Sequence, residues 1–217
     1  MMKLQAQKLA KKYNNVLVFR DVSLEAETGV VGIAGPNGSG KSTLLKCLTY
    51  LLRPTRGKVT WTDAENSIPV QEFRSRIGYA APYINLYAEL SCMENLKFLL
   101  KVRDIKREDP ELEDILGRVG LSRLFDQPFG QLSSGQQQRL RLAAALLPKP
   151  EVLILDEPGT NLDKVGQSVV QSITEEWRQK GRLLLLASND ATELDWCDKV
   201  FNLTQISKKE PSVSTPK

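Results

Sequence analysis

A glycine-rich segment, Gly35-Pro-Asn-Gly-Ser-Gly-Lys-Ser42, constrains this chain more than any other feature. It fits the pattern GxxxxGK[ST], and it lies between a continuous apolar run at residues 30–34 and a helical pattern over residues 41–52. Glycines let the backbone wrap around phosphate oxygens, and the N–H groups at the start of the helix present positive charge to an anion. The segment, called the phosphate loop below, therefore predicts nucleotide binding between a buried parallel strand and a helix.

The side chains of the phosphate loop predict individual contacts with a nucleotide. Lys41 is expected to reach the β and γ phosphates, the Ser42 hydroxyl to ligate Mg²⁺, and Thr43 to contact the α phosphate. The candidate nucleotide-binding residues of this segment are Gly35, Asn37, Gly38, Ser39, Gly40, Lys41, Ser42 and Thr43.

A second motif ends an apolar run at residues 152–155 with two carboxylates, Asp156 and Glu157. Beside a phosphate loop, Asp156 is predicted to hold Mg²⁺ directly or through water. Glu157 is then predicted to polarise the water that attacks the γ phosphate, as the catalytic base. The alternative is a strand that ends in two solvated charges.

A third motif, Leu132-Ser-Ser-Gly-Gln-Gln-Gln-Arg139, precedes the acidic strand and opens a helical pattern; it is called the signature segment below. Ser133 or Ser134 is predicted to cap this helix, whose N-terminus is a second anion site. The three motifs in this order resemble the ATP-binding subunit of the ABC transporter family, and the resemblance covers residues 3–206.

The resemblance implies a head-to-tail pair of such subunits, with each ATP held between the phosphate loop of one and the signature segment of the other. Ser133 and Gly135 would then touch the γ phosphate bound to the second subunit. Tyr13 matches the aromatic residue that stacks on adenine, unless it is only a surface tyrosine at a strand end. Asp163 matches a residue that communicates between the two sites, unless it is only a helix N-cap.

Two positions depart from the family. Pro82 stands where the family usually has a glutamine that contacts Mg²⁺ or water, and proline has no side-chain donor or acceptor for that task. Tyr83 and Asn85 lie nearby as weak candidates to replace it. Asn189 stands where the family has a histidine that contacts the γ phosphate, and the whole chain has no histidine. An asparagine amide donates a hydrogen bond but carries no titrating proton.

The apolar patterns predict an α/β fold, which the resemblance specifies as a P-loop NTPase core of mainly parallel sheet. Antiparallel strands are expected near the N-terminus, at residues 3–9, 22–26 and 57–62. Further buried strands are expected at residues 77–79, 152–155 and 183–187, and helices at residues 109–119 and 134–147. Ser91 and Glu94 form the pattern of a capping box before a helix that ends near Val102.

The domain organisation follows from these patterns. We expect one ABC-type ATP-binding domain over residues 1–206, with a helical subdomain inserted at about residues 85–147. Residues 207–217 are polar and contain proline, which predicts a disordered tail.

Composition limits the other classes of protein. No stretch reaches the roughly 18 consecutive apolar residues of a membrane helix, and the N-terminus lacks the apolar core of a signal peptide, which predicts a cytoplasmic protein. The net charge of +4 permits a polyanionic partner without demanding one, and no nucleic acid is expected because the chain has a single ATP-binding unit and no strongly basic arm. Three distant cysteines, Cys47, Cys92 and Cys197, are expected to be buried or half-buried thiols without chemistry.

The favoured hypothesis is an ATP-hydrolysing transporter subunit that uses ATP and Mg²⁺, acts on a separate integral membrane subunit at the cytoplasmic face, and forms a homodimer rather than a heterodimer. The missing histidine predicts slow hydrolysis in isolation. The alternatives are a soluble family member that acts on ribosomes or nucleic acid, and a weakly hydrolysing regulatory subunit. The chain is also similar to small exporter motors, including the haem-exporter ATPase of cytochrome c maturation.

Overall fold

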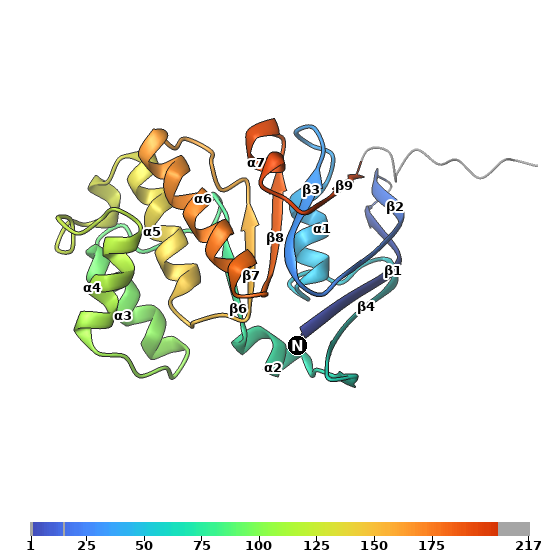
Figure 1. The fold of residues 1–217 in the computed structure, drawn as a ribbon, viewed down its shortest axis with the longest axis horizontal. Helices are drawn as coiled ribbons and strands as arrows, with labels where there is room; N and C mark the ends of the chain where they lie inside the picture. The colour runs from blue at the N-terminus through green and yellow to red at the C-terminus, as the bar shows by residue number, and fades with distance from the viewer. Residues whose placement is uncertain (1, 15, 204–217) are drawn as a thin grey trace, which may run out of the picture.

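The computed structural model describes residues 2–14 and 16–203, which form two β-sheets and the helices that pack on them (Figure 1). The first sheet is antiparallel and has the strand order β2-β1-β4-β5. Its strands are β1 (Met2–Tyr13), β2 (Val16–Ala26), β4 (Arg56–Asp63) and β5 (Asn66–Ser67). This is the antiparallel N-terminal sheet that the alternating sequence pattern predicts.

The second sheet is parallel and has the strand order β6-β7-β8-β3-β9. Its strands are β3 (Gly29–Ala34), β6 (Ile77–Ala80), β7 (Val152–Asp156), β8 (Leu183–Ser188) and β9 (Lys199–Asn202). Because parallel strands end at the same edge, the segments that follow β3, β7 and β8 meet there. The phosphate loop, Glu157 and Asn189 are those three segments.

Burial on both faces explains the uninterrupted apolar runs of β3, β7 and β8. Alternate side chains of these strands point to opposite faces, so that Leu153 and Leu155 pack among the helices while Val152 and Ile154 pack toward the antiparallel sheet. The chain therefore has one apolar core on each side of the parallel sheet.

The helices are distributed over the two faces of the parallel sheet (Figure 1). They are α1 (Lys41–Leu48), α2 (Val70–Ser75), α3 (Cys92–Val102), α4 (Asp109–Arg118), α5 (Ser134–Leu146), α6 (Lys164–Gln179) and α7 (Ala191–Asp195), with a 3₁₀ turn η1 (Phe129–Gln131). α1 lies between the two sheets, whereas α3, α4, α5 and α6 pack on the other face. The predicted capping box is present, because the Ser91 hydroxyl accepts from the Glu94 N–H and the Glu94 carboxylate accepts from the Ser91 N–H.

Two sequence-based boundaries differ from the structure. α1 ends at Leu48 rather than at residue 52, because Tyr50 adopts a left-handed backbone with a φ of 57°. β1 continues to Tyr13, well beyond the predicted residues 3–9. The alternating pattern does not reveal this continuation, because the pairing with β2 shifts register between Ala6 and Leu9 and interrupts the alternation of side chains there.

A close backbone approach joins β6 to α5. A Cβ added at Gly78 would lie 2.1 Å from the carbonyl oxygen of Ala145, so no larger residue fits while helix and strand keep this separation. The strand that leads to the nucleotide pocket is thus in direct backbone contact with the helix that the signature segment begins.

Within the described part of the chain, no helix combines the length and the hydropathy needed to span a bilayer. The predicted tail at residues 207–217 lies outside the described residues. The division into a core and an inserted helical subdomain stays a prediction.

Candidate functional site

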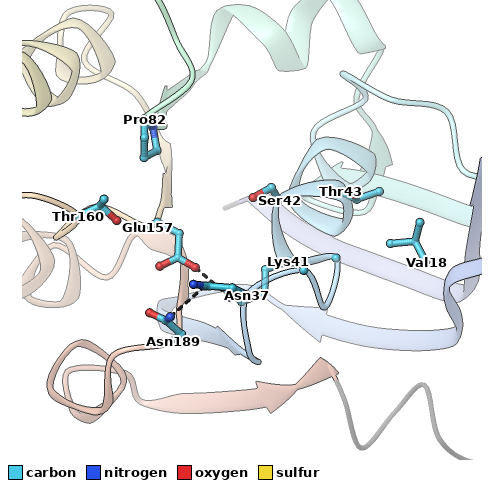
Figure 2. Close-up of a pocket in the computed structure, with 11 residues that line it drawn as sticks. Val18, Asn37, Lys41, Ser42, Thr43, Pro82, Glu157, Thr160 and Asn189 are labelled. Carbon is cyan, nitrogen blue, oxygen red and sulfur yellow. Dashed lines mark hydrogen bonds and ion pairs between the residues drawn. The ribbon is translucent and has the colours of Figure 1, made fainter.

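A pocket of about 550 Å³ opens at the edge where β3, β7 and β8 end (Figure 2). Four segments that are distant in the sequence contribute to it: the phosphate loop with the start of α1, the turn after β6, the loop after β7, and the residue after β8. A valine of β2 closes one side. The lining residues are Val18, Asn37, Gly38, Gly40, Lys41, Ser42, Thr43, Pro82, Glu157, Thr160 and Asn189.

The glycine spacing of the phosphate loop sets its backbone geometry. Gly40 directly precedes α1 with a φ of 97°, a left-handed conformation that favours glycine. A Cβ at this position would also lie 2.6 Å from the Val18 side chain. The chain can therefore turn sharply into α1 and place Lys41 at its first position.

The Lys41 side chain is 5% exposed, and its ammonium group lies among oxygen acceptors. Lys41 Nζ lies 2.6 Å from the Gly35 carbonyl oxygen and 3.3 Å from that of Pro36, and it lies 2.8 Å from Glu157 Oε1. Figure 2 shows the Glu157 carboxylate pointing across the pocket toward Lys41. The lysine predicted to bind phosphate and the carboxylate predicted to activate water thus form an ion pair.

Glu157 is held at the end of β7 by its backbone. Its φ is 49°, which is left-handed, and its N–H donates to the Ala187 carbonyl oxygen of β8 at 2.8 Å. Its side chain is 23% exposed at the pocket surface. The sharp turn after Asp156 therefore directs these two adjacent carboxylates to different places.

Asp156 is buried and accepts hydrogen bonds on both carboxylate oxygens. The Ser42 hydroxyl donates to Oδ1 at 3.0 Å, and the Tyr83 hydroxyl donates to Oδ2 at 3.0 Å. Burial raises the pKa of the Asp156 carboxyl, and the hydrogen bonds from Ser42 and Tyr83 oppose that rise. Hydroxyl and carboxylate oxygens are donors that suit Mg²⁺, so the pair Ser42 and Asp156 fits this ion.

Asn189 follows β8 and faces the phosphate loop. Its amide nitrogen donates to Asn37 Oδ1 at 2.9 Å, as the second dashed line in Figure 2 shows. The residue in the histidine position of the family thus reaches the loop through an amide that can donate.

The signature segment lies beside the loop after β7. Ser133 rather than Ser134 caps α5, in a capping box with Gln136. A Cβ at Gly135 would lie 3.0 Å from the Asn161 carbonyl oxygen. Asp163 caps α6, because its carboxylate accepts from the Gly166 N–H at 2.8 Å. Neither Ser133, Gly135 nor Asp163 is among the residues that line the pocket of their own chain.

Several predicted residues lie apart from the pocket lining, and two lining residues were not predicted. Tyr13 ends β1 with Lys11 Nζ 4.9 Å from its ring centroid, and it is not part of the lining. Gly35 and Ser39 are likewise outside the lining. Val18 and Thr160 do line the pocket. No residue-type signal marks Val18, whereas Thr160 lies three residues after Glu157, in the loop that leads to Asp163, and could have been inferred from that position.

The cysteines agree with the sequence-based expectation of burial. Cys47 and Cys92 are buried and Cys197 is half-buried, all three as free thiols. Burial raises the pKa of Cys47 and of Cys92 to about 11 and that of Cys197 to about 12.

Comparison with known proteins places this geometry in context. Residues 19–160 match the family described as ABC transporter. The chain is 36% identical, over 91% of each chain, to the cytochrome c biogenesis ATP-binding export protein CcmA of Histophilus somni. It is 31% identical to the arginine/ornithine transport ATP-binding protein AotP of Pseudomonas aeruginosa, over 88% of this chain and 82% of the relative.

Solved structures share the fold. A putative ABC transporter ATP-binding protein from Pyrococcus furiosus superposes with a TM-score of 0.80 at 29% identity, over 94% of this chain and 99% of its own. A bacterial ABC transporter cassette whose structure is described as dimeric superposes with a TM-score of 0.78 at 25% identity, over 92% and 94% of the two chains.

Proposed function

The chain belongs to the ABC transporter family as an ATP-binding subunit with ATPase activity, and we propose that it hydrolyses MgATP in the pocket where the phosphate loop meets the end of β7. One observation carries this assignment. Lys41 lies 2.8 Å from Glu157 while the neighbouring Ser42 lies 3.0 Å from Asp156, so the four groups that the reaction needs converge from two segments.

Binding of ATP exchanges one partner of Lys41 for another. The ammonium group leaves Glu157 and pairs with the β and γ phosphates, while the N–H groups at the start of α1 take further phosphate oxygens. Ser42 and Asp156 would hold Mg²⁺, and the bound ion would neutralise charge on the phosphates. Thr43 lines the same pocket and contacts the α phosphate.

Hydrolysis then uses the groups that ATP binding has freed. Glu157, released from Lys41, accepts a hydrogen bond from the attacking water and draws off its proton as the water adds to the γ phosphorus. The bond to the β–γ bridging oxygen breaks, which gives ADP and phosphate. The Asn189 amide turns from Asn37 to the γ phosphate and donates a hydrogen bond as charge develops there.

A second copy of the chain completes each site in this proposal. Ser133 and Gly135 stand at the N-terminus of α5, away from the pocket of their own chain, so they are free to meet the γ phosphate bound to another copy. The similar cassette described as dimeric supports this arrangement. We propose a homodimer that closes on ATP.

The dimer is tested with Glu157→Gln, which keeps the pocket and removes the base. In saturating MgATP this variant should elute from a size-exclusion column as a dimer, whereas Lys41→Ala should remain a monomer. A Glu157→Gln protein that stays monomeric would contradict the homodimer and point to a different second subunit.

The transported substrate is expected to be set by a membrane partner. Relatives at 31–36% identity are named for unrelated systems: cytochrome c biogenesis, arginine/ornithine transport, lipopolysaccharide export and lantibiotic transport. Similarity at this level therefore identifies the motor and not its cargo. We propose that the chain works at the cytoplasmic face of a membrane through an integral membrane subunit.

The proposed site is tested by titrating MgATP into the wild type and into Lys41→Ala by isothermal titration calorimetry. Lys41→Ala should bind MgATP much more weakly than the wild type, because the substitution deletes the charge that pairs with phosphate. Lys97→Ala is the matched control, since Lys97 pairs with Asp109 on the protein surface and is not among the residues that line the pocket. Equal affinity in Lys41→Ala and the wild type would show that the nucleotide binds elsewhere.

A further inference from the structure

Two tyrosine hydroxyls gather on the side of Asp156 that faces away from Ser42. Tyr83 donates to Asp156 Oδ2 at 3.0 Å, and the Tyr79 hydroxyl lies 2.7 Å from that of Tyr83 and 3.4 Å from Oδ2. An ionised carboxylate only accepts, and each hydroxyl has a single proton. Since the Tyr83 proton goes to Asp156, the Tyr79 proton goes to the nearer oxygen, that of Tyr83. The result is a relay from Tyr79 through Tyr83 to Asp156.

The turn after β6 produces this contact. The Ile84 N–H donates to the Ala81 carbonyl oxygen at 3.1 Å, which closes a four-residue turn with Pro82 and Tyr83 at its centre. Proline is favoured at the first central position of such a turn because its φ is already fixed near the required value. Pro82 offers no side-chain hydrogen bond, but its turn folds the chain so that the next side chain reaches back to Asp156.

The Tyr83 ring is also contacted by a lysine of α1. Lys46 Nζ, on α1, lies 3.9 Å from the centroid of the ring, a distance typical of a cation–π contact. Tyr83 is therefore held between the helix that follows the phosphate loop and the carboxylate at the end of β7. Although 43% of the residue is exposed, its hydroxyl is directed at a side chain that is fully buried.

We propose that Tyr83 is a positioning residue for the metal-bound nucleotide: by donating to Asp156 Oδ2 it fixes the carboxylate plane so that Oδ1 faces Ser42, the residue with which it would hold Mg²⁺. The inference rests on the proposed function, since it concerns the same Mg²⁺ site. Hydrogen bonds to a ligating carboxylate orient it, and their loss typically lowers metal affinity by about 10- to 100-fold. Tyr79 supports Tyr83 in the same role, one step further from the metal.

The test compares nucleotide affinity with and without metal, which needs no turnover. AMP-PNP is titrated by calorimetry into the wild type, Tyr83→Phe, Tyr79→Phe and the control Tyr87→Phe, in Mg²⁺ and in EDTA. Tyr87 is an exposed tyrosine of the same segment whose ring packs against Phe98 with a centroid distance of 4.7 Å. The measured quantity is the ratio of the two affinities for each protein.

Tyr83→Phe should lower the ratio by about 10-fold, Tyr79→Phe by less, and Tyr87→Phe should match the wild type. A Tyr83→Phe ratio equal to that of the wild type would overturn the proposal. A higher ratio would overturn it too, because it would mean that the hydroxyl competes with the metal for Oδ2. If Tyr83→Phe fails to fold, Lys46→Met removes the ring support but keeps the hydroxyl, and it should lower the ratio in the same direction; an unchanged ratio would then refute the role. A wild type that binds no AMP-PNP in Mg²⁺ would instead refute the proposed function.

Discussion

The ion pair between Lys41 and Glu157 predicts that neutralising Glu157 strengthens nucleotide binding. Lys41 must leave this carboxylate before it can pair with phosphate, so the pair is a cost that binding has to overcome. Glu157→Gln keeps the shape of the side chain and removes its charge. A hydrogen bond between charged groups contributes about 1.5–3 kcal/mol, and the partial exposure of Glu157 reduces this to about 1 kcal/mol.

A difference of about 1 kcal/mol corresponds to an affinity for AMP-PNP that is about fivefold higher in Glu157→Gln, measured by calorimetry in Mg²⁺. The same substitution should lower the melting temperature of the nucleotide-free protein by about 2–4 °C, because Lys41 loses a partner. The two effects together distinguish the ion pair from simple repulsion between Glu157 and the γ phosphate. Repulsion alone would raise affinity without any loss of stability in the free protein.

Glu151→Gln is the matched control, since Glu151 pairs with Arg76 at 2.6 Å outside the pocket. It should leave nucleotide affinity unchanged, whatever its effect on stability. An affinity of Glu157→Gln equal to or weaker than that of the wild type would refute the reasoning. So would a higher affinity that comes with an unchanged melting temperature.

Two further predictions follow from the site and from the thiols. Asn189→Ala should lower kcat by up to about 10²-fold if hydrolysis limits turnover, whereas Asn189→His should keep or raise kcat. Only Asn189→His should show a limb near neutrality in its pH–rate profile, because the wild type has no imidazole. Unchanged turnover in Asn189→Ala would show that Asn189 is only a strand-end residue. The free energy of unfolding should fall as pH rises from about 9 toward 11, because the raised pKa of Cys47 and of Cys92 keeps these thiols protonated in the folded chain while the unfolded chain releases their protons. In urea titrations across this pH range, replacing both cysteines by alanine should make the free energy of unfolding depend less steeply on pH. An equally steep dependence would argue against the thiols as its source.

The sequence predicts the parts of the site that depend on local backbone geometry. The phosphate loop can be predicted from the sequence because the turn into α1 requires its glycines, as the φ of Gly40 shows. Asp156 and Glu157 could be predicted because two carboxylates at the end of an apolar strand supply a Mg²⁺ ligand and a base beside a phosphate loop. Asn189 could be placed because the family resemblance puts a histidine just after the buried strand predicted at residues 183–187.

The contacts that sequence reasoning missed depend on side chains from distant segments. The ion pair between Lys41 and Glu157 joins residues whose side chains cross the pocket, and nothing in either local pattern sets that direction. Tyr83 was only a weak candidate, because its reach to Asp156 depends on the register of β6 beside β7 and on the turn at Pro82. The proline was interpreted only as a loss, although its preference for the first central position of a turn was the available signal.

The missing side chain at Gly78 has a mechanical consequence. With backbone against backbone at Ala145, no flexible layer lies between β6 and α5 to absorb a displacement. Arg141 of α5 also donates to the Ile84 carbonyl oxygen at 2.6 Å, so the Pro82 turn and Ser133 lie at the same end of this unit, and a shift of the turn moves α5 and Ser133 with it as one rigid body. Substituting even alanine at Gly78 would force β6 and α5 apart where their backbones meet.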